Sequence, residues 1–244
     1  MELLLVRHGE STANVARERA ELSGAEQIAV EARDADVGLS ELGQRQSEAL
    51  GLWLATQADC RVDAVWSSPY RRARDTATNA LTAAGLDLDI RIDERLRDKE
   101  LGILDTFTST GIRNRFPEEA ERRRWLGKFY YRAPGGESWA DVALRVRSVL
   151  ADIVGSGRHH PMIVCHDAVI MLFRYVCEGL DETTVVDIAR ADPVGNTAVS
   201  RLAAAADAPG WALVEYNSQA HLLRDGADLR TTHPASEPRP DEAT

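Results

Sequence analysis

The chain has 244 residues, of which 44% are hydrophobic, and it carries a formal net charge of −10 at pH 7. This hydrophobic content is typical of a globular protein with a buried core, whereas an acidic chain lacks the basic surface that a nucleic-acid-binding domain needs. No stretch reaches the roughly 20 apolar residues that a membrane-spanning helix requires.

The cysteines and the N-terminal residues exclude further classes of protein. Cys60, Cys165 and Cys177 are too few and too scattered for a disulfide framework or a zinc site. The apolar run at residues 2–6 is too short for a signal peptide. We therefore expect a cytoplasmic protein, and we expect Cys165 to be buried as a small hydrophobic residue.

The first part of the chain alternates between predicted strands and helices. Residues 2–7 form an apolar run typical of a strand that is buried on both faces. Residues 15–37 are highly charged and weakly periodic, and we expect a mobile or helical segment there. The next elements are a helix after the N-cap Ser40, a strand at 62–68, a helix that starts at Pro69 and ends at Gly85, and a strand at 86–92.

The second part begins with a polar insertion at residues 93–135. The elements expected after it are a helix from the capping box of Ser138 and Asp141 to about residue 154, a strand at 161–165, a helix at 168–179, and strands at 197–203 and 211–216. Residues 230–244 are rich in proline and polar residues, and we expect a disordered tail. Alternating strands and helices predict an α/β fold with a mostly parallel central sheet flanked by helices, in one domain over residues 1–229.

Charged and titratable side chains follow three of the predicted strands. Arg7 and His8 end the first strand, Arg72 lies in the helix after the second, and His166 follows the strand at 161–165. Because parallel strands end at one edge of a sheet, we expect these side chains to meet there. Arginines and a helix N-terminus bind a phosphate dianion, a histidine can attack phosphorus, and a second histidine can stabilise the transferring group. The pattern predicts phosphoryl transfer through His8.

Seven segments, in order, resemble the histidine phosphatase superfamily, in the branch that includes cofactor-dependent phosphoglycerate mutase and fructose-2,6-bisphosphatase. They are residues 3–14, 38–46, 67–77, 95–102, 135–142, 163–169 and 195–202. An Arg-His-Gly sequence alone is a weak signal, but seven segments in order are a specific one. The resemblance implies a phosphoglycerate mutase-like three-layer sandwich, in which the insertion at 93–135 covers the substrate.

The resemblance also implies roles for individual residues. His8 is expected to be the nucleophile that forms a phosphohistidine, and Asn196 is expected to lie nearby. The residues expected around the phosphoryl group are Arg7, Asn14, Arg72 and His166, with Glu137 and Ser138 near the floor of the pocket, where they would orient an arginine or the nucleophile. No metal and no organic cofactor is implied.

The sequence identifies the general acid less clearly than it identifies the nucleophile. The family usually has a glutamate in a Leu-x-Glu sequence, and this chain has Asp98 at that position, one methylene shorter. Glu100 and Asp167 are the alternatives, because an aspartate after the second histidine is the proton donor in the acid phosphatase and phytase branch. Asp98 ranks first, since the rest of the chain follows the mutase-like branch.

Other conspicuous residues have plainer interpretations. Arg71 and Arg74 are expected on a solvated helix face, and His159 and His160 in a loop without a third metal ligand at suitable spacing. The sequence ERRRW at 121–125 fits a solvated helix and a substrate clamp about equally well.

The sequence therefore favours a phosphomonoesterase that acts on a small phosphorylated metabolite. The first alternative is a phosphoglycerate mutase-type phosphotransferase, which is disfavoured because no tryptophan follows Asn14 before Trp53 and because the arginines at 122–124 precede Trp125. The second is a non-catalytic relative that binds a phosphorylated ligand, against which the complete set of His8, Arg7, Arg72 and His166 argues. A small phosphorylated substrate is the expected partner, and a homodimer is left open.

Overall fold

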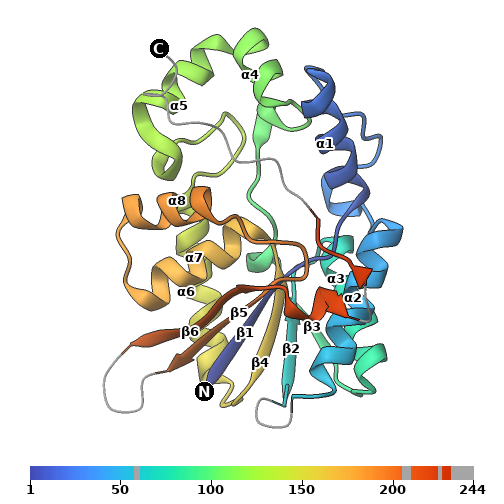
Figure 1. The fold of residues 1–244 in the computed structure, drawn as a ribbon. Helices are drawn as coiled ribbons and strands as arrows, with labels where there is room; N and C mark the ends of the chain where they lie inside the picture. Colours follow the sequence, from blue (N-terminus) through green and yellow to red (C-terminus); the bar gives the residue numbers. More distant parts are fainter. Residues whose placement is uncertain (58–60, 205–209, 225–226, 232–244) are drawn as a thin grey trace.

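The computed structural model describes residues 1–57, 61–204, 210–224 and 227–231 (Figure 1). Cys60 and the part of the predicted tail from residue 232 onward lie outside the described residues. Within the described part of the chain, no helix is both long enough and apolar enough to span a membrane.

A six-stranded sheet forms the centre of the fold, in the order β3-β2-β4-β1-β5-β6. Its strands are β1 (Glu2–Arg7), β2 (Ala64–Ser67), β3 (Ile90–Ile92), β4 (Pro161–Cys165), β5 (Val199–Ala204) and β6 (Trp211–Ser218). The neighbours from β3 to β1 pair in parallel, while β5 runs antiparallel to both β1 and β6. The predicted α/β class with a mostly parallel sheet is confirmed.

Helices cover both faces of this sheet and complete a three-layer sandwich (Figure 1). Helices α2 (Glu41–Leu54) and α3 (Arg71–Ala84) pack on one face, and α6 (Trp139–Gly155) and α7 (Asp167–Glu178) pack on the other. Helix α8 (Glu182–Ala191) packs against α7.

The continuous apolar run of β1 follows from this burial on both faces. Leu3 and Leu5 belong to the core under α6 and α7, while Leu4 and Val6 belong to the core under α2 and α3. All four side chains are fully buried. Since side chains alternate along a strand, a central strand between two helical layers needs an apolar residue at every position.

A third group of helices lies beyond the C-terminal ends of the parallel strands (Figure 1). It contains α1 (Thr12–Ser23), α4 (Ser109–Arg115) and α5 (Pro117–Tyr130), with three short 3-10 helices, η1 (Asp34–Asp36), η2 (Glu94–Leu96) and η3 (Gly102–Leu104). Leu104, Tyr131 and Ala133 form a small separate core in this region. The segment at 93–135 is therefore a partly independent unit above the sheet edge.

Several predicted boundaries are confirmed. The Ser40 hydroxyl accepts the backbone N–H of Gly43 at the start of α2, and Ser138 and Asp141 form the predicted capping box of α6. Gly85 ends α3 in the left-handed conformation. Cys165 is fully buried.

Other boundaries differ from the prediction for identifiable reasons. Helix α3 begins at Arg71 rather than at Pro69, because Tyr70 is extended and its N–H donates to the Ser68 hydroxyl at 3.2 Å. The strand expected at 86–92 is reduced to Ile90–Ile92, because it is an edge strand that pairs only with β2.

Elements without a sequence prediction include η2, η3 and α4 in the insertion, α8, and the segments after β6. The latter are η4 (Ala220–Leu222) and the hairpin of β7 (Leu223–Arg224) and β8 (Ala227–Asp228). The charged segment at 15–37 contains most of α1 and all of η1.

Helices α2 and α3 approach each other closely at Gly51. A Cβ atom at this position would lie 2.3 Å from the Ala80 carbonyl oxygen and 2.7 Å from the Ala83 Cβ. Both neighbours belong to a helix whose backbone cannot move without disturbing the core under β2 and β4.

We expect Gly51→Ala to destabilise the protein by about 1–3 kcal/mol, because the added methyl group overpacks the contact between α2 and α3. Equilibrium urea unfolding measures the change. Gly155→Ala is the matched control, since a Cβ at Gly155 meets nothing within 4 Å and alanine favours the helix. Equal free energies of unfolding for wild type and Gly51→Ala would contradict this packing.

Candidate active site

Three strand ends meet at the C-terminal edge of the sheet. His8 follows β1 and its backbone N–H donates to the Cys165 carbonyl at 3.0 Å, while Ser68 follows β2 and its N–H donates to the Val164 carbonyl at 3.0 Å. His166 follows β4, and its ring centre lies 5.1 Å from that of His8. The structure thus brings together the residues that the strand pattern predicted to converge.

The hydrogen bonds of His8 define its tautomer. Nδ1 lies 2.7 Å from the Gly9 carbonyl oxygen. Because a carbonyl can only accept, Nδ1 carries the proton and Nε2 keeps its lone pair. The Arg72 Nε–H donates to this lone pair at 3.2 Å. The unprotonated nitrogen of His8 therefore faces the arginine.

Electrostatics keep His8 neutral. Burial lowers its pKa well below the ordinary 6.5, and the positive charges of Arg72 and Arg7 and the neighbouring His166 lower it further. The hydrogen bond to Gly9 opposes this shift but does not reverse it. The lone pair on Nε2 is thus present at neutral pH.

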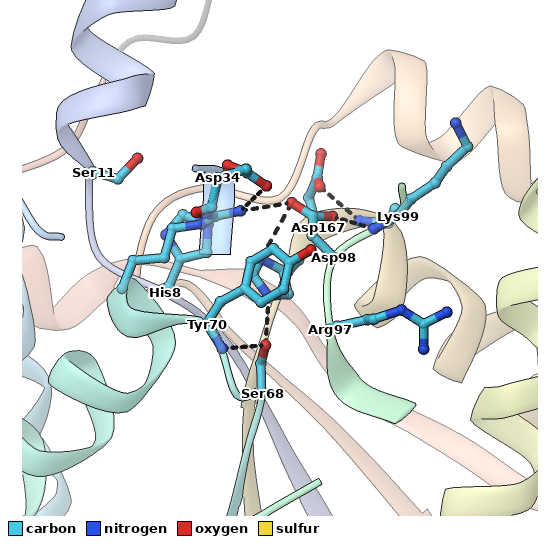
Figure 2. A network of polar contacts seen from close by, with 12 residues as sticks. His8, Ser11, Asp34, Ser68, Tyr70, Arg97, Asp98, Lys99 and Asp167 are labelled. Carbon is cyan, nitrogen blue, oxygen red and sulfur yellow. Dashed lines mark hydrogen bonds and ion pairs between the residues drawn. The ribbon is translucent and has the colours of Figure 1, made fainter. Parts of the chain in front are cut away.

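Arg72 is the centre of the polar network, and its side chain is only 4% exposed. Besides Nε, Nη1 donates to the Asp34 carbonyl oxygen at 2.7 Å and to Asp34 Oδ1 at 2.9 Å. Nη2 donates to Asp34 Oδ2 at 3.2 Å and to Asp98 Oδ2 at 3.1 Å. A guanidinium has five N–H groups, and all five of Arg72 have a protein acceptor. Figure 2 shows Asp34 and Asp98 beside His8 in this network.

His166 lies between a hydroxyl and a carboxylate. Its Nε2 is 2.9 Å from the Ser68 hydroxyl oxygen, and its Nδ1 is 3.3 Å from Asp98 Oδ2. Burial lowers the pKa of His166, and the adjacent Asp98 carboxylate partly offsets that effect. The ring is fully buried.

The Asp98 carboxylate lies beside both Arg72 and His166. Burial alone raises its pKa, but His166, Arg72 and the backbone N–H of Lys99 outweigh burial and hold the pKa well below its usual range. The Lys99 N–H donates to Asp98 Oδ1 at 2.8 Å. In this structure Asp98 is therefore ionised.

Arg145 fixes the segment that carries Asp98. Its guanidinium donates to the carbonyl oxygens of Arg95, Arg97 and Asp98 at 2.6, 2.8 and 3.1 Å. Glu137 accepts hydrogen bonds from Arg145 and, at 2.6 Å, from Arg97. It therefore lies with the segment that carries Asp98 and makes no hydrogen bond to His8. Figure 2 shows Arg97 pointing away from His8.

Three further residues predicted for the site, Asn196, Arg7 and Asn14, make hydrogen bonds to the protein itself. Asn196 donates to the His8 carbonyl at 3.0 Å and accepts from the Thr231 hydroxyl at 2.8 Å. Arg7 donates to the Val194 carbonyl. The Asn14 amide oxygen caps helix α1 by accepting the N–H and the hydroxyl of Ser11.

Helix α2 holds the loop after His8 by direct backbone contact. A Cβ at Gly43 would lie 2.0 Å from the Glu10 carbonyl oxygen, so only glycine fits at this crossing. The Glu10 N–H donates to Gln46 at 2.8 Å, and the Ser40 hydroxyl donates to the Glu10 carboxylate. These contacts explain why the family-like segment 38–46 occurs together with the segment that contains His8: residues 38–46 hold the loop after His8 in place.

The alternative proton donors have other partners. The Glu100 carboxylate accepts from the Tyr70 hydroxyl at 2.9 Å, and Asp167 accepts the N–H of Ala168 at 2.7 Å at the start of α7. Of the basic residues assigned to the surface, Arg71 pairs with Asp75 and is largely exposed. Trp125, in the ERRRW segment, is 82% exposed.

Asp34 and Arg145 hold central positions in this network but carry no sequence prediction. Arg145 could have been noticed as a single arginine on the buried apolar face of α6, beside Val142 and Val146. Asp34 has no local signal, because it lies in an aperiodic segment and its partner Arg72 is 38 residues away. Among the described residues, no three His, Cys, Asp or Glu side chains are grouped as a metal-binding set.

Comparison with known proteins agrees with this geometry. The profile of the histidine phosphatase superfamily, branch 1, matches residues 3–219, nearly the whole chain. The chain belongs to the histidine phosphatase superfamily. The match spans all three strand ends described above.

Two curated relatives share part of this superfamily region. A bifunctional protein of Mycobacterium tuberculosis is 39% identical over 145 residues, which cover 59% of this chain and 35% of that protein. The 6-phosphofructo-2-kinase/fructose-2,6-bisphosphatase of Gallus gallus is 28% identical over 168 residues, which cover 69% of this chain and 31% of that protein. The chain thus spans about a third of the length of these relatives.

Solved structures match over most of their length. The mycobacterial glucosyl-3-phosphoglycerate phosphatase is 27% identical with a TM-score of 0.69, covering 89% of this chain and 98% of that chain. The α-ribazole phosphatase of Shigella flexneri, at 20% identity, a TM-score of 0.70 and coverage of 89% and 96%, shares the fold.

We expect the free energy of unfolding to fall as the pH drops from 6.5 to 5.5. His8 has a lowered pKa in the folded protein, so the unfolded chain takes up the proton first, and the stability present above pH 6.5 is lost below it. One such histidine contributes up to about 1.4 kcal/mol per pH unit. Urea unfolding at pH 7.5, 6.5 and 5.5 should show a smaller loss for His8→Gln than for wild type; equal losses would contradict the shift.

Proposed function

We propose that the protein is a phosphomonoesterase that hydrolyses a small phosphorylated metabolite through a phosphohistidine at His8. The observation that carries the proposal is a neutral, buried His8 whose Nδ1 proton is bound by Gly9 and whose Nε2 faces Arg72. A nucleophilic nitrogen held beside a buried guanidinium suits attack on a phosphate dianion.

In the first step, Nε2 of His8 attacks the phosphorus and the bond from phosphorus to the ester oxygen breaks. Arg7, Arg72 and His166 stabilise the charge on the transferring group, and the Asn14 amide nitrogen donates to one of its oxygens. Positioning and positive charge supply most of what phosphoryl transfer needs. The products are a phosphohistidine and the alcohol.

The leaving oxygen takes a proton from Asp98. Asp98 is ionised without substrate, because Arg72 and the Lys99 N–H stabilise its charge. A bound phosphate dianion that engages Arg72 adds negative charge beside Asp98 and raises its pKa, so that the carboxyl binds a proton with the substrate. Glu137 acts as a positioning residue through Arg145, which fixes the Asp98 backbone.

In the second step, water attacks the phosphohistidine. Asp98, now a carboxylate, accepts a proton from that water, the bond from Nε2 to phosphorus breaks, and inorganic phosphate leaves. His8 returns to its neutral form with Nδ1 still bound to Gly9.

The relatives support a phosphatase rather than a phosphotransferase. The solved structures matched above are a glucosyl-3-phosphoglycerate phosphatase and an α-ribazole phosphatase by name, and one curated relative includes a fructose-2,6-bisphosphatase. For this chain we propose only the substrate class, a phosphate ester of a small metabolite. Residues 1–229 are proposed to act as one catalytic domain, with residues 93–135 contacting the leaving group.

We expect His8→Ala to lower kcat/KM for p-nitrophenyl phosphate by more than about a thousandfold, because no other nucleophile replaces Nε2. Release of inorganic phosphate is measured for this substrate and for a panel that includes 3-phosphoglycerate. His160→Ala is the control and should retain turnover, since His160 lies at the opposite end of β4. Turnover by His8→Ala at the wild-type rate would reject the mechanism, and isomerisation of 3-phosphoglycerate without phosphate release would reject the phosphatase.

We expect Asp98→Asn to slow alkyl phosphates by about a hundredfold or more and aryl phosphates far less, because a phenolate leaves without prior protonation. Steady-state kinetics on a leaving-group series measure this difference. Glu100→Gln and Asp167→Asn are the matched comparisons. If one of them shows the leaving-group dependence and Asp98→Asn does not, Asp98 is not the acid.

A further inference from the structure

Asp34 is bound to Arg72 more extensively than any other residue in the site. Its two carboxylate oxygens and its carbonyl oxygen accept three of the five N–H groups of Arg72. This two-pronged arrangement of a carboxylate on a guanidinium is also how an arginine binds phosphate. The Asp34 carboxylate therefore occupies the acceptor positions that a phosphoryl group needs.

The remaining N–H groups of Arg72 are also taken. Nε donates to His8, and the second hydrogen of Nη2 donates to Asp98. A phosphoryl oxygen can thus bind Arg72 only by displacing one of these acceptors. A phosphate dianion is in addition repelled by a carboxylate on the same guanidinium.

Asp34 is the acceptor that can leave at low cost. Its side chain is 41% exposed, whereas that of Asp98 is 26% exposed and is also held by His166 and the Lys99 N–H. The 3-10 helix of Asp34 contains no buried residue, and the flanking Ile28 and Val37 anchor the segment in the core. No residue of 29–36 is fully buried, so this segment can shift with little loss of buried apolar surface.

The same contacts restrain the nucleophile. With Asp34 in place, the Arg72 Nε–H points at the lone pair of His8 Nε2, which must be free for attack on phosphorus. When Asp34 leaves, the guanidinium can turn towards a phosphoryl oxygen and release that lone pair. Figure 2 shows Asp34 and His8 on the same side of the network.

We propose that Asp34 is a latch that competes with phosphate for Arg72. It closes the site when no dianion is bound, weakens the affinity for inorganic phosphate, and thereby promotes product release after each turnover. The proposal rests on the proposed function, since it takes Arg72 to be the phosphate ligand.

The test measures binding of inorganic phosphate by isothermal titration calorimetry and its inhibition constant against p-nitrophenyl phosphate. We expect Asp34→Ala to bind phosphate about tenfold more tightly than wild type, because the competing ion pair on a buried guanidinium is removed. Asp34→Asn removes the charge and keeps the shape, and it should give a smaller gain. Asp36→Ala is the control and should match wild type, since Asp36 lies in the same 3-10 helix and pairs with Arg33 instead.

The outcomes separate the latch from the proposed function. If wild type hydrolyses the ester and Asp34→Ala and Asp34→Asn bind phosphate with unchanged or weaker affinity, the latch is wrong and the phosphatase stands. If Asp34→Ala loses turnover of alkyl phosphates selectively, Asp34 is a proton donor and the latch is also wrong. If neither wild type nor Asp34→Ala binds phosphate or hydrolyses esters, both proposals fall.

Discussion

The parallel pairing of β4 with β1 on one side and β2 on the other is the constraint on which the site depends. This pairing sets Arg7 opposite Cys165 and Ser67 opposite Val164. The segments that follow the three strands therefore leave the sheet within hydrogen-bonding distance of one another. A shift of one residue in either register would turn the side chains to the other face of the sheet. The burial of β4 and of residues 3–7 of β1 on both faces makes such a shift costly.

Charge balance governs the residues gathered at this edge. Two buried arginines and two histidines would repel one another if all were charged, and burial lowers the pKa of both histidines. Asp34 and Asp98 compensate the positive charge of Arg72. In the proposed reaction, a phosphate dianion takes the place of the Asp34 carboxylate on Arg72, so that substrate binding exchanges one anion for another rather than neutralising an open positive pocket.

The fold and the convergence at the sheet edge were accessible from the sequence, because they depend on local patterns. Apolar runs, the Ser40 cap and the capping box at Ser138 are each readable within a few residues. The contact of Asp34 with Arg72 was not accessible, since the two residues are 38 positions apart. Arg145 stands out only as an arginine on an apolar helix face, and its carbonyl partners, about 50 residues away, could not be read from the sequence. The edge strand β3 was overestimated because its length is set by β2 and not by its own alternation.

The hydrogen bonds from Asn196 to His8 and from Thr231 to Asn196 also bear on how the protein is made. The residues in the first of these bonds are 188 positions apart, and β1 finds both of its neighbours in the sheet only after β4 and β5 have been synthesised. A growing chain therefore holds its nucleophile without its supports for most of its synthesis. Such non-local closure slows folding and leaves the apolar strand β1 unpaired in the meantime, which exposes it to aggregation until the later strands pair with it.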